Sequence, residues 1–272
     1  MRVDLTIAVL TYKDNGLLTD CLQSLWAQDI SDPSLKAWEL LIVDDASPEP
    51  PQILLPHRLV RHASNSGSNI LPSNTAFREA QGEWVLLMAN DVRLHPGAIE
   101  ALWAHRFTHD ITQPVLYQPD GKVDNVGLRW VWPGYGVRVR NTRSRRVDAF
   151  ANTCVLMKQT TWLAVGGFDV GLGISHEDID FSLRARRLGY RIGYCPHASA
   201  THLMGQTIGR VVQKPLTPYY QAARHRTILT NYQGLDRWAR LTATGWLDGL
   251  SARARQWRHR APDSPQAASA PP

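Results

Sequence analysis

The chain has 272 residues, 43% of them hydrophobic, which is enough for one large domain or for one domain with an appendage. Its composition is that of an ordinary globular protein, and no apolar run is long enough to span a bilayer. Asp4 and Lys13 interrupt any signal-peptide core, and three widely spaced cysteines exclude a disulfide framework or a paired-cysteine metal site. We therefore expect reduced thiols and a cytoplasmic location, either free or peripheral on the inner face of the cell membrane.

The net charge of +6 is placed unevenly, because residues 210–272 carry ten Lys or Arg and three acids. The rest of the chain is therefore close to neutral. A basic end of this kind predicts contact with an anionic surface, either a membrane or a nucleic acid. Since the sequence contains no recognisable base-reading module, nucleic acid is not an expected partner.

Strands and helices alternate over the first 110 residues. Apolar, β-branched runs predict buried strands, and amphipathic segments between them predict helices. The predicted strands are 3–11, 38–43, 58–61 and 84–88. This alternation predicts the α/β class, with a doubly wound, mostly parallel central sheet.

The alternation stops after residue 110, and residues 111–157 are predicted to be β-rich or irregular. The segment 132–136, Trp-Pro-Gly-Tyr-Gly, is either an exposed aromatic platform for a sugar or base, or part of a long loop with buried tryptophans. A short strand is predicted at 190–195.

Acids follow two of the predicted strands. Asp44 and Asp45 end one strand, and Asp91 follows another. Ligands of parallel sheets bind at the carboxyl ends of strands, where carboxylates suit a nucleotide or a metal–diphosphate group. Asp is also a common turn residue, so each position taken alone leaves both interpretations open. The absence of G-x-G-x-x-G and of a P-loop argues against a nicotinamide dehydrogenase and a P-loop phosphoryl-transfer enzyme.

A further group of acids lies in the stretch 166–189, where two glycines precede a predicted helix. Ser175 stands three residues before Asp178, close to the spacing of a capping box. At a helix N-terminus, the dipole is expected to hold Asp178 ionised, which suits a general base. The alternative is that Glu177 and Asp178 only cap the helix.

In chain order, these motifs resemble glycosyltransferase family 2, whose members share the Rossmann-like GT-A fold. The resemblance covers most of residues 3–205. The matching segments are 7–12, 42–48, 65–67 with Asn74, 81–84, 90–92, 166–169, 176–178 and His202.

The resemblance implies an inverting enzyme that moves a sugar from a nucleotide-sugar donor, a dTDP- or UDP-sugar, to an acceptor hydroxyl. It implies Asp178 as the catalytic base, with Glu177 beside it, and Asp91 and His202 as ligands of Mg²⁺ or Mn²⁺. The implied donor contacts are Thr11, Tyr12, Asp44, Asp45, Asn74 and Asn90. The implied acceptor loop includes Gly167, Phe168 and Trp132.

One position departs from the family pattern. The D-x-D metal motif falls on 89–91, and Ala89 replaces its first acid. Only Asp91 remains to reach the metal, helped by Asn90 and His202. An alternative function is therefore a catalytically weak protein that binds a nucleotide sugar.

Three regions are expected: a catalytic domain over 1–209, a basic helical extension over 210–260 and a disordered tail over 261–272. Segment 217–233 resembles a helix of family members that act on lipid-linked acceptors. Residues 235–260 form either an amphipathic helix on a membrane surface or a helix packed on the core. The expected acceptor is a saccharide or lipid-linked saccharide, and the resemblance suggests rhamnosyl transfer into a cell-surface polysaccharide.

Overall fold

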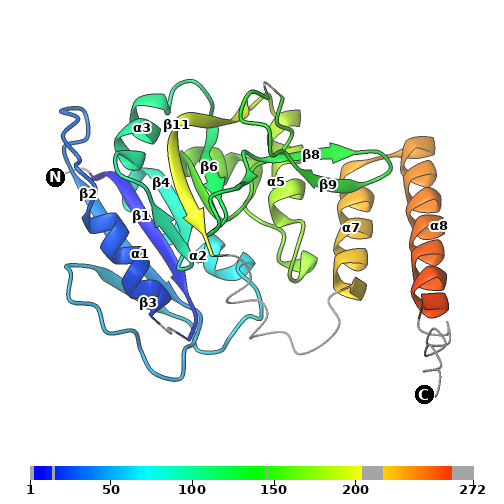
Figure 1. Cartoon of the computed structure of the whole chain (residues 1–272), viewed down its shortest axis with the longest axis horizontal. Coiled ribbons are helices and arrows are strands. Elements are labelled where there is room, and N and C mark those ends of the chain that lie inside the picture. The colour runs from blue at the N-terminus through cyan, green and yellow to red at the C-terminus, as the bar shows by residue number, and fades with distance from the viewer. Residues whose placement is uncertain (1–2, 14–15, 145, 204–216, 259–272) are drawn as a thin grey trace, which may run out of the picture.

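A nine-stranded sheet organises the described part of the chain, which comprises residues 3–13, 16–144, 146–203 and 217–258 of a computed structural model (Figure 1). The strand order is β3-β2-β1-β4-β10-β6-β11-β5, with β7 attached to β6. The strands are β1 (Val3–Thr11), β2 (Trp38–Asp44), β3 (Arg58–Arg61), β4 (Gly82–Ala89), β5 (Val92–Leu94), β6 (Ile111–Tyr117), β7 (Val123–Asn125), β10 (Cys154–Lys158) and β11 (Ile192–His202). Of these, β10, β5 and β7 run against the others, which confirms a mostly parallel α/β sheet.

The first four strands are parallel, because the chain crosses back between them, through α1 after β1, through a long loop after β2 and through α2 after β3. The central strand β1 pairs with β2 on one side and β4 on the other. Thr11 pairs with Asp44, and Leu10 pairs with Ala89, so the three strands end at one edge of the sheet.

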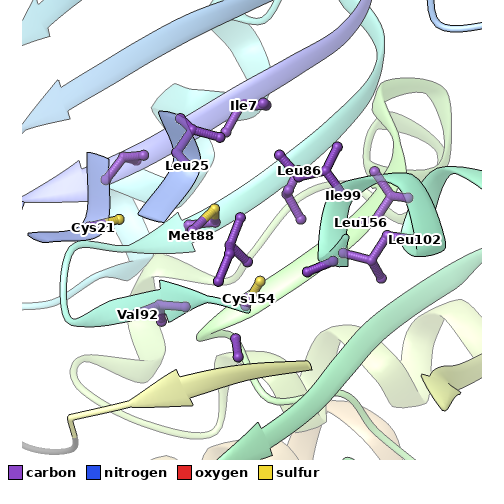
Figure 2. Packing of buried hydrophobic residues seen from close by; sticks show 14 of the residues in the cluster. Ile7, Cys21, Leu25, Leu86, Met88, Val92, Ile99, Leu102, Cys154 and Leu156 are labelled. Carbon is purple, nitrogen blue, oxygen red and sulfur yellow. The ribbon is translucent and has the colours of Figure 1, made fainter. Parts of the chain in front are cut away.

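Helices cover both faces of the sheet. One hydrophobic cluster joins it to α1 (Leu17–Trp26) and α3 (Ala98–His105). Figure 2 shows part of this cluster, where the buried thiols of Cys21 and Cys154 lie among the aliphatic side chains around Met88. A second cluster holds α2 (Ile70–Glu79), α4 (Gln159–Val165) and α5 (Glu177–Arg187). The fold is therefore doubly wound, as predicted.

The structure corrects the prediction for the second half of the sheet. Strand β5 was not predicted, and β11 extends to His202, well past the predicted end at 195. A local irregularity between Cys195 and Ser199 interrupts the pairing of β11 with β6, and Pro196 lies inside it. Because β5 pairs with the last residues of β11, the strand continues beyond this break. A separate hairpin consists of β8 (Leu128–Val131) and β9 (Tyr135–Arg138).

Two long helices, α7 (Thr217–Asn231) and α8 (Gly234–Arg258), lie side by side at the end of the molecule remote from the N-terminus (Figure 1). Asn231 donates to the buried carboxylate of Asp180 on α5 over 2.6 Å, and Arg224 on α7 pairs with Asp248 on α8. The predicted boundary at 209/210 and the tail 261–272 lie outside the described residues. Among the described helices, none is both long and apolar enough to cross a membrane.

The close pairing of β1 and β4 yields a first prediction. A Cβ atom on Gly82 would lie 2.4 Å from the backbone nitrogen of Thr6, so Gly82→Ala forces the strands apart. We expect a loss of about 1–3 kcal/mol in the free energy of unfolding, measured by urea denaturation. Gly249→Ala is the control, because a Cβ there meets open space on an exposed helix. Equal urea midpoints for Gly82→Ala and the wild type would contradict this account.

Candidate active site

Polar groups from three strand ends meet at the carboxyl edge of the sheet. The backbone N–H of Asp45 donates to the Thr11 carbonyl over 3.0 Å, and the Asn90 side chain donates to the Thr11 hydroxyl over 3.0 Å. The N–H of Lys13 donates to the Ser47 hydroxyl over 2.8 Å, which brings the backbone after Tyr12 against the turn that follows β2. The structure therefore brings together five of the predicted donor residues, Thr11, Tyr12, Asp44, Asp45 and Asn90.

Asp44 and Asp45 are both buried and shape different loops. Asp44 accepts hydrogen bonds from the Ser47 hydroxyl at 2.5 Å and from Nε of Arg61 at 2.7 Å. Asp45 accepts from the side chains of Asn65 and Ser66 and lies 2.7 Å from Nδ1 of His62. Each carboxylate therefore fixes one wall of the strand-end site.

Asn74 and Phe168 have different roles from those predicted. The amide oxygen and nitrogen of Asn74 bond the backbone N–H and carbonyl of Phe168, both over 2.9 Å. Asn74 thus braces the loop before α5. The Phe168 ring is buried against Phe77, Phe150 and Phe181, so it cannot contact an acceptor.

Gly167 belongs to the same braced loop. It has a φ of 71°, and a Cβ there would lie 2.9 Å from the Trp162 ring. A residue without a side chain is therefore required at this position.

A cavity of about 310 Å³ lies between β7, β9, α5 and β11, and neither Asp91 nor any predicted donor residue is among its lining residues. Its lining includes Asp124, Arg138, His176, Asp178, His202 and Tyr220. Asp178 and His202, which are 24 positions apart in sequence, thus face the same space. Glu177 does not line this cavity, and neither does Trp132, which is 60% exposed at the tip of the β8–β9 hairpin.

The ionisation of Asp178 differs from the prediction. Burial, and then the adjacent carboxylate of Glu177, raise the pKa of Asp178 to about 8, despite hydrogen bonds from the N–H groups of Ile179 and Asn152. Burial also raises the pKa of Glu177, which accepts a hydrogen bond from the Asn152 side chain. Low-dielectric surroundings therefore outweigh the helix N-terminus that was expected to keep Asp178 ionised.

The predicted cap of α5 is also wrong. The helix begins after His176, which has a φ of 68°, and the Ser175 hydroxyl contacts the His176 ring over 2.8 Å instead of a backbone N–H. Burial, and then the charge of Arg224, lower the pKa of His176 to about 4. His176 is therefore neutral, with its ring edge-on to Trp130.

Asp91 and His202 lie together because β5 pairs with the end of β11. Val92 pairs with His202, and the N–H of Leu203 donates to the Asp91 carbonyl over 2.9 Å. Nε2 of His202 is 3.6 Å from Oδ2 of Asp91, and Nδ1 is 3.7 Å from Oδ2 of Asp124. Burial disfavours the charged ring, but the two carboxylates outweigh it and raise the pKa of His202 to about 9.

A divalent cation fits these residues only in part. A carboxylate and an imidazole nitrogen converge on one spot, which suits Mg²⁺ or Mn²⁺ when diphosphate oxygens complete the shell. Within the described ranges, no group of three or more His, Cys, Asp or Glu side chains could hold a metal alone. The side chain of Asn90, the residue expected to help, is held through its amide nitrogen, which donates to the Thr11 hydroxyl.

The sequence did not reveal Asp124, Arg138, Asn152 or Tyr220 as site residues. Asp124 follows a turn in a segment without helical or strand periodicity, and its neighbour His202 is 78 positions away. Tyr220 reaches the cavity only because α7 packs back against α5. Their one local signal, a charged, amide or aromatic side chain, is shared with many surface residues.

A mixed α/β sheet with helices on both faces and polar groups at its strand ends is the architecture of the GT-A fold. The chain matches the glycosyl transferase family 2 profile over residues 6–161, more than half of its length, and it belongs to that family. It is similar to an N-acetylglucosaminyl-diphospho-decaprenol L-rhamnosyltransferase of Mycobacterium tuberculosis, with 26% identity over 163 residues. That match covers 52% of this chain and 53% of the relative, so the chain spans about half the length of the curated relatives it matches.

Solved structures show the same fold at low identity. Staphylococcus aureus TarS 1–349 in complex with UDP-GlcNAc is similar with a TM-score of 0.61 and 21% identity, covering 89% of this chain and 71% of TarS. GalNAc-T7 with UDP, GalNAc and Mn²⁺ has a TM-score of 0.61 and 14% identity, covering 80% of this chain and 48% of that one. These similarities confirm the GT-A fold.

Proposed function

We propose that this glycosyltransferase inverts the anomeric centre of its donor sugar and that Asp178 is the general base. The observation that carries the proposal is the position of Asp178 in the cavity beside His202 and Arg138, whereas Glu177 is turned into the protein. A carboxylate with a raised pKa is a stronger base once ionised, and positioned bases of this kind contribute about 10²–10⁴-fold in rate.

The donor lies across the ends of β1, β2 and β4 in this proposal. Thr11, Tyr12 and the loops fixed by Asp44 and Asp45 surround the base and ribose, and Asn90 keeps the end of β4 against β1. Asp178 then accepts the proton of the acceptor hydroxyl as this oxygen attacks the anomeric carbon from the face opposite the diphosphate.

Asp91 and His202 would hold Mg²⁺ or Mn²⁺ at the diphosphate. When bound, the cation supplies positive charge that stabilises the leaving group. An imidazole ligand favours Mn²⁺ over Mg²⁺.

We infer a dTDP- or UDP-sugar as donor and a saccharide or lipid-linked saccharide as acceptor. The rhamnosyltransferase relative is named for a lipid-diphosphate-linked sugar, and UDP-GlcNAc is present in a related structure. Arg138, whose side chain is 44% exposed, adds a positive charge to the cavity wall. Among the described lining residues there is no other lysine or arginine. The role is then a step in cell-surface polysaccharide or glycolipid synthesis.

The outer face of α8 supports a contact with the membrane surface. Leu235, Trp238, Trp246 and Leu250 are 89%, 70%, 67% and 43% exposed and share one side of the helix. The opposite side packs on the protein through buried Thr244 and a bond from Arg240 to the Pro133 carbonyl. One side of α8 thus packs on the core, and the open Trp/Leu face followed by an arginine-rich stretch of sequence supports contact with an anionic interface.

Replacing the proposed base gives a direct test of the mechanism. Asp178→Asn removes the proton acceptor but keeps the shape, so transfer should fall by about 10²–10⁴-fold while UDP binding stays within about twofold. Nucleotide release from UDP- and dTDP-sugars, with sugar acceptors and Mn²⁺, measures turnover, and calorimetry with UDP measures binding.

Asp120→Asn is the matched control, because this acid is exposed in a surface turn and pairs with Lys122. Turnover of Asp178→Asn within a few-fold of this control would refute the assignment. UDP binding without turnover of any donor by the wild type would favour the alternative of a nucleotide-sugar-binding protein.

The pH profile gives an independent prediction. Asp178 must be ionised to accept a proton, and its pKa is raised to about 8, so kcat/KM should be low at pH 6 and rise with pH. The acid limb should approach about tenfold per pH unit and level off above the pKa. A profile that is flat from pH 6 to 9, or that falls as the pH rises, would contradict a single buried base.

The membrane contact is tested with vesicles of phosphatidylglycerol and phosphatidylethanolamine. The double variant Trp238→Ser with Trp246→Ser should co-sediment at least about tenfold less than the wild type, because each Trp contributes apolar area to the interface. Trp26→Ser is the control, since Trp26 is 61% exposed on α1. Absence of wild-type binding, or equal loss in the control, would rule out this contact.

A further inference from the structure

His202 stands between two carboxylates that approach its two ring nitrogens. Nε2 faces Asp91 at 3.6 Å, and Nδ1 faces Asp124 at 3.7 Å. The ring is 15% exposed, and Nδ1 is buried with no hydrogen-bond partner in the described part of the chain. The ring nitrogen that points away from Asp91 therefore has one carboxylate beside it, that of Asp124.

The sheet itself places Asp124 there. Strand β6 pairs with β11 on one side and with β7 on the other, and Tyr117 at its end is opposite Thr201 on β11 and Val123 on β7. His202 follows Thr201 and Asp124 follows Val123, so each lies within about one residue of Tyr117, on either side of β6. Two short segments far apart in sequence thus flank the end of one shared strand, and their side chains reach each other there.

Asp124 is held rigidly as well as buried. Its side chain is 1% exposed, Arg138 donates to one carboxylate oxygen, and the Asn125 amide donates to the other over 2.9 Å. The negative charge of this carboxylate is therefore held in one place, 3.7 Å from Nδ1 of His202.

We propose that Asp124 is a positioning residue of the metal site, which holds the His202 imidazole with Nε2 directed toward Asp91. The inference rests on the proposed role of Asp91 and His202 as metal ligands. Metal-binding histidines usually donate their second ring N–H to a carboxylate or carbonyl, which fixes ring orientation and tautomer. Because Ala89 replaces the first acid of the metal motif, Asp91 and His202 are the two protein ligands proposed for the cation. The orientation of the His202 ring therefore decides whether one of these two ligands can bind it.

Two other roles for Asp124 must be separated from positioning. The carboxylate could serve only to neutralise Arg138, or it could bind the metal itself. Asp124→Asn retains size and an oxygen acceptor but loses the charge, and Arg138→Gln breaks the ion pair while leaving the carboxylate beside His202. Asp148→Asn is the matched control, because Asp148 is also a buried acid paired with arginines but does not line the cavity.

The test is a Mn²⁺ titration of the full chain with saturating UDP, followed by the electron paramagnetic resonance signal of free Mn²⁺. Asp124→Asn should raise the Kd for Mn²⁺ about tenfold, within the range of about 10–100-fold typical of such partners. Arg138→Gln should weaken Mn²⁺ binding less than Asp124→Asn does, because Asn125 still holds the Asp124 carboxylate, and Asp148→Asn should stay within about threefold of wild type. Pulsed measurements at saturating Mn²⁺ should show ¹⁴N modulation from the imidazole in the wild type and reduced modulation in Asp124→Asn.

Each contrary result has a distinct meaning. An unchanged Kd in Asp124→Asn, when His202→Ala weakens binding, overturns the positioning role alone. Equal weakening by Arg138→Gln, or weaker binding of Asp124→Asn with intact ¹⁴N modulation, also overturns it, since the ion pair or direct ligation then explains the loss. If Asp91→Asn and His202→Ala both leave the Kd unchanged, the proposed metal site itself fails.

Discussion

The parallel pairing of β1 with both β2 and β4 is the constraint on which the site depends. Because Thr11 is opposite Asp44 and Leu10 is opposite Ala89, the three strands stop together, and the residues that follow them meet at one edge. A slip of one residue in either pairing would turn every buried side chain of the strand to the opposite face. Core packing and site geometry are therefore set by the same register.

A second register completes the site from the other side. The pairing of β6 with β11 and β7 brings His202 and Asp124 together, and the pairing of β5 with β11 adds Asp91. The braced loop before α5 then presents Asp178 to the cavity, with Asn74 fixing the backbone of Phe168. The proposed acid–base and metal-binding groups are thus supplied by strands and a helix start, which are rigid supports for positioned chemistry.

The parts of this arrangement that were predictable depend on local pattern. Buried β-branched runs and the acids that end them gave the strands of the first half and the positions of Asp44 and Asp91. The ion pair between Asp180 and Arg184 was equally accessible, because helical spacing alone places the two side chains together at 2.7 Å.

The parts that could not be predicted depend on contacts between distant segments. Nothing in the sequence near Asn74 or Phe168 indicates that these two residues, 94 positions apart, bind each other. The end of β11 likewise depends on pairing with two other segments, β6 and the separate strand β5. The raised pKa of Asp178 requires its burial beside Glu177, which sequence spacing does not show. Exposure of Trp238 and Trp246 likewise becomes clear only once the opposite face of α8 is seen to pack on the protein.

The central claim is that the nucleotide and the cation bind at one sheet edge, next to the cavity that Asp178 and His202 line. A crystal structure of the chain with UDP and Mn²⁺, with anomalous data collected for manganese, tests it most directly. The account predicts a manganese peak within coordination distance of the Asp91 carboxylate and Nε2 of His202, with the uracil at the ends of β1 and β2. A manganese peak away from this pair, or UDP bound away from this edge, would contradict it.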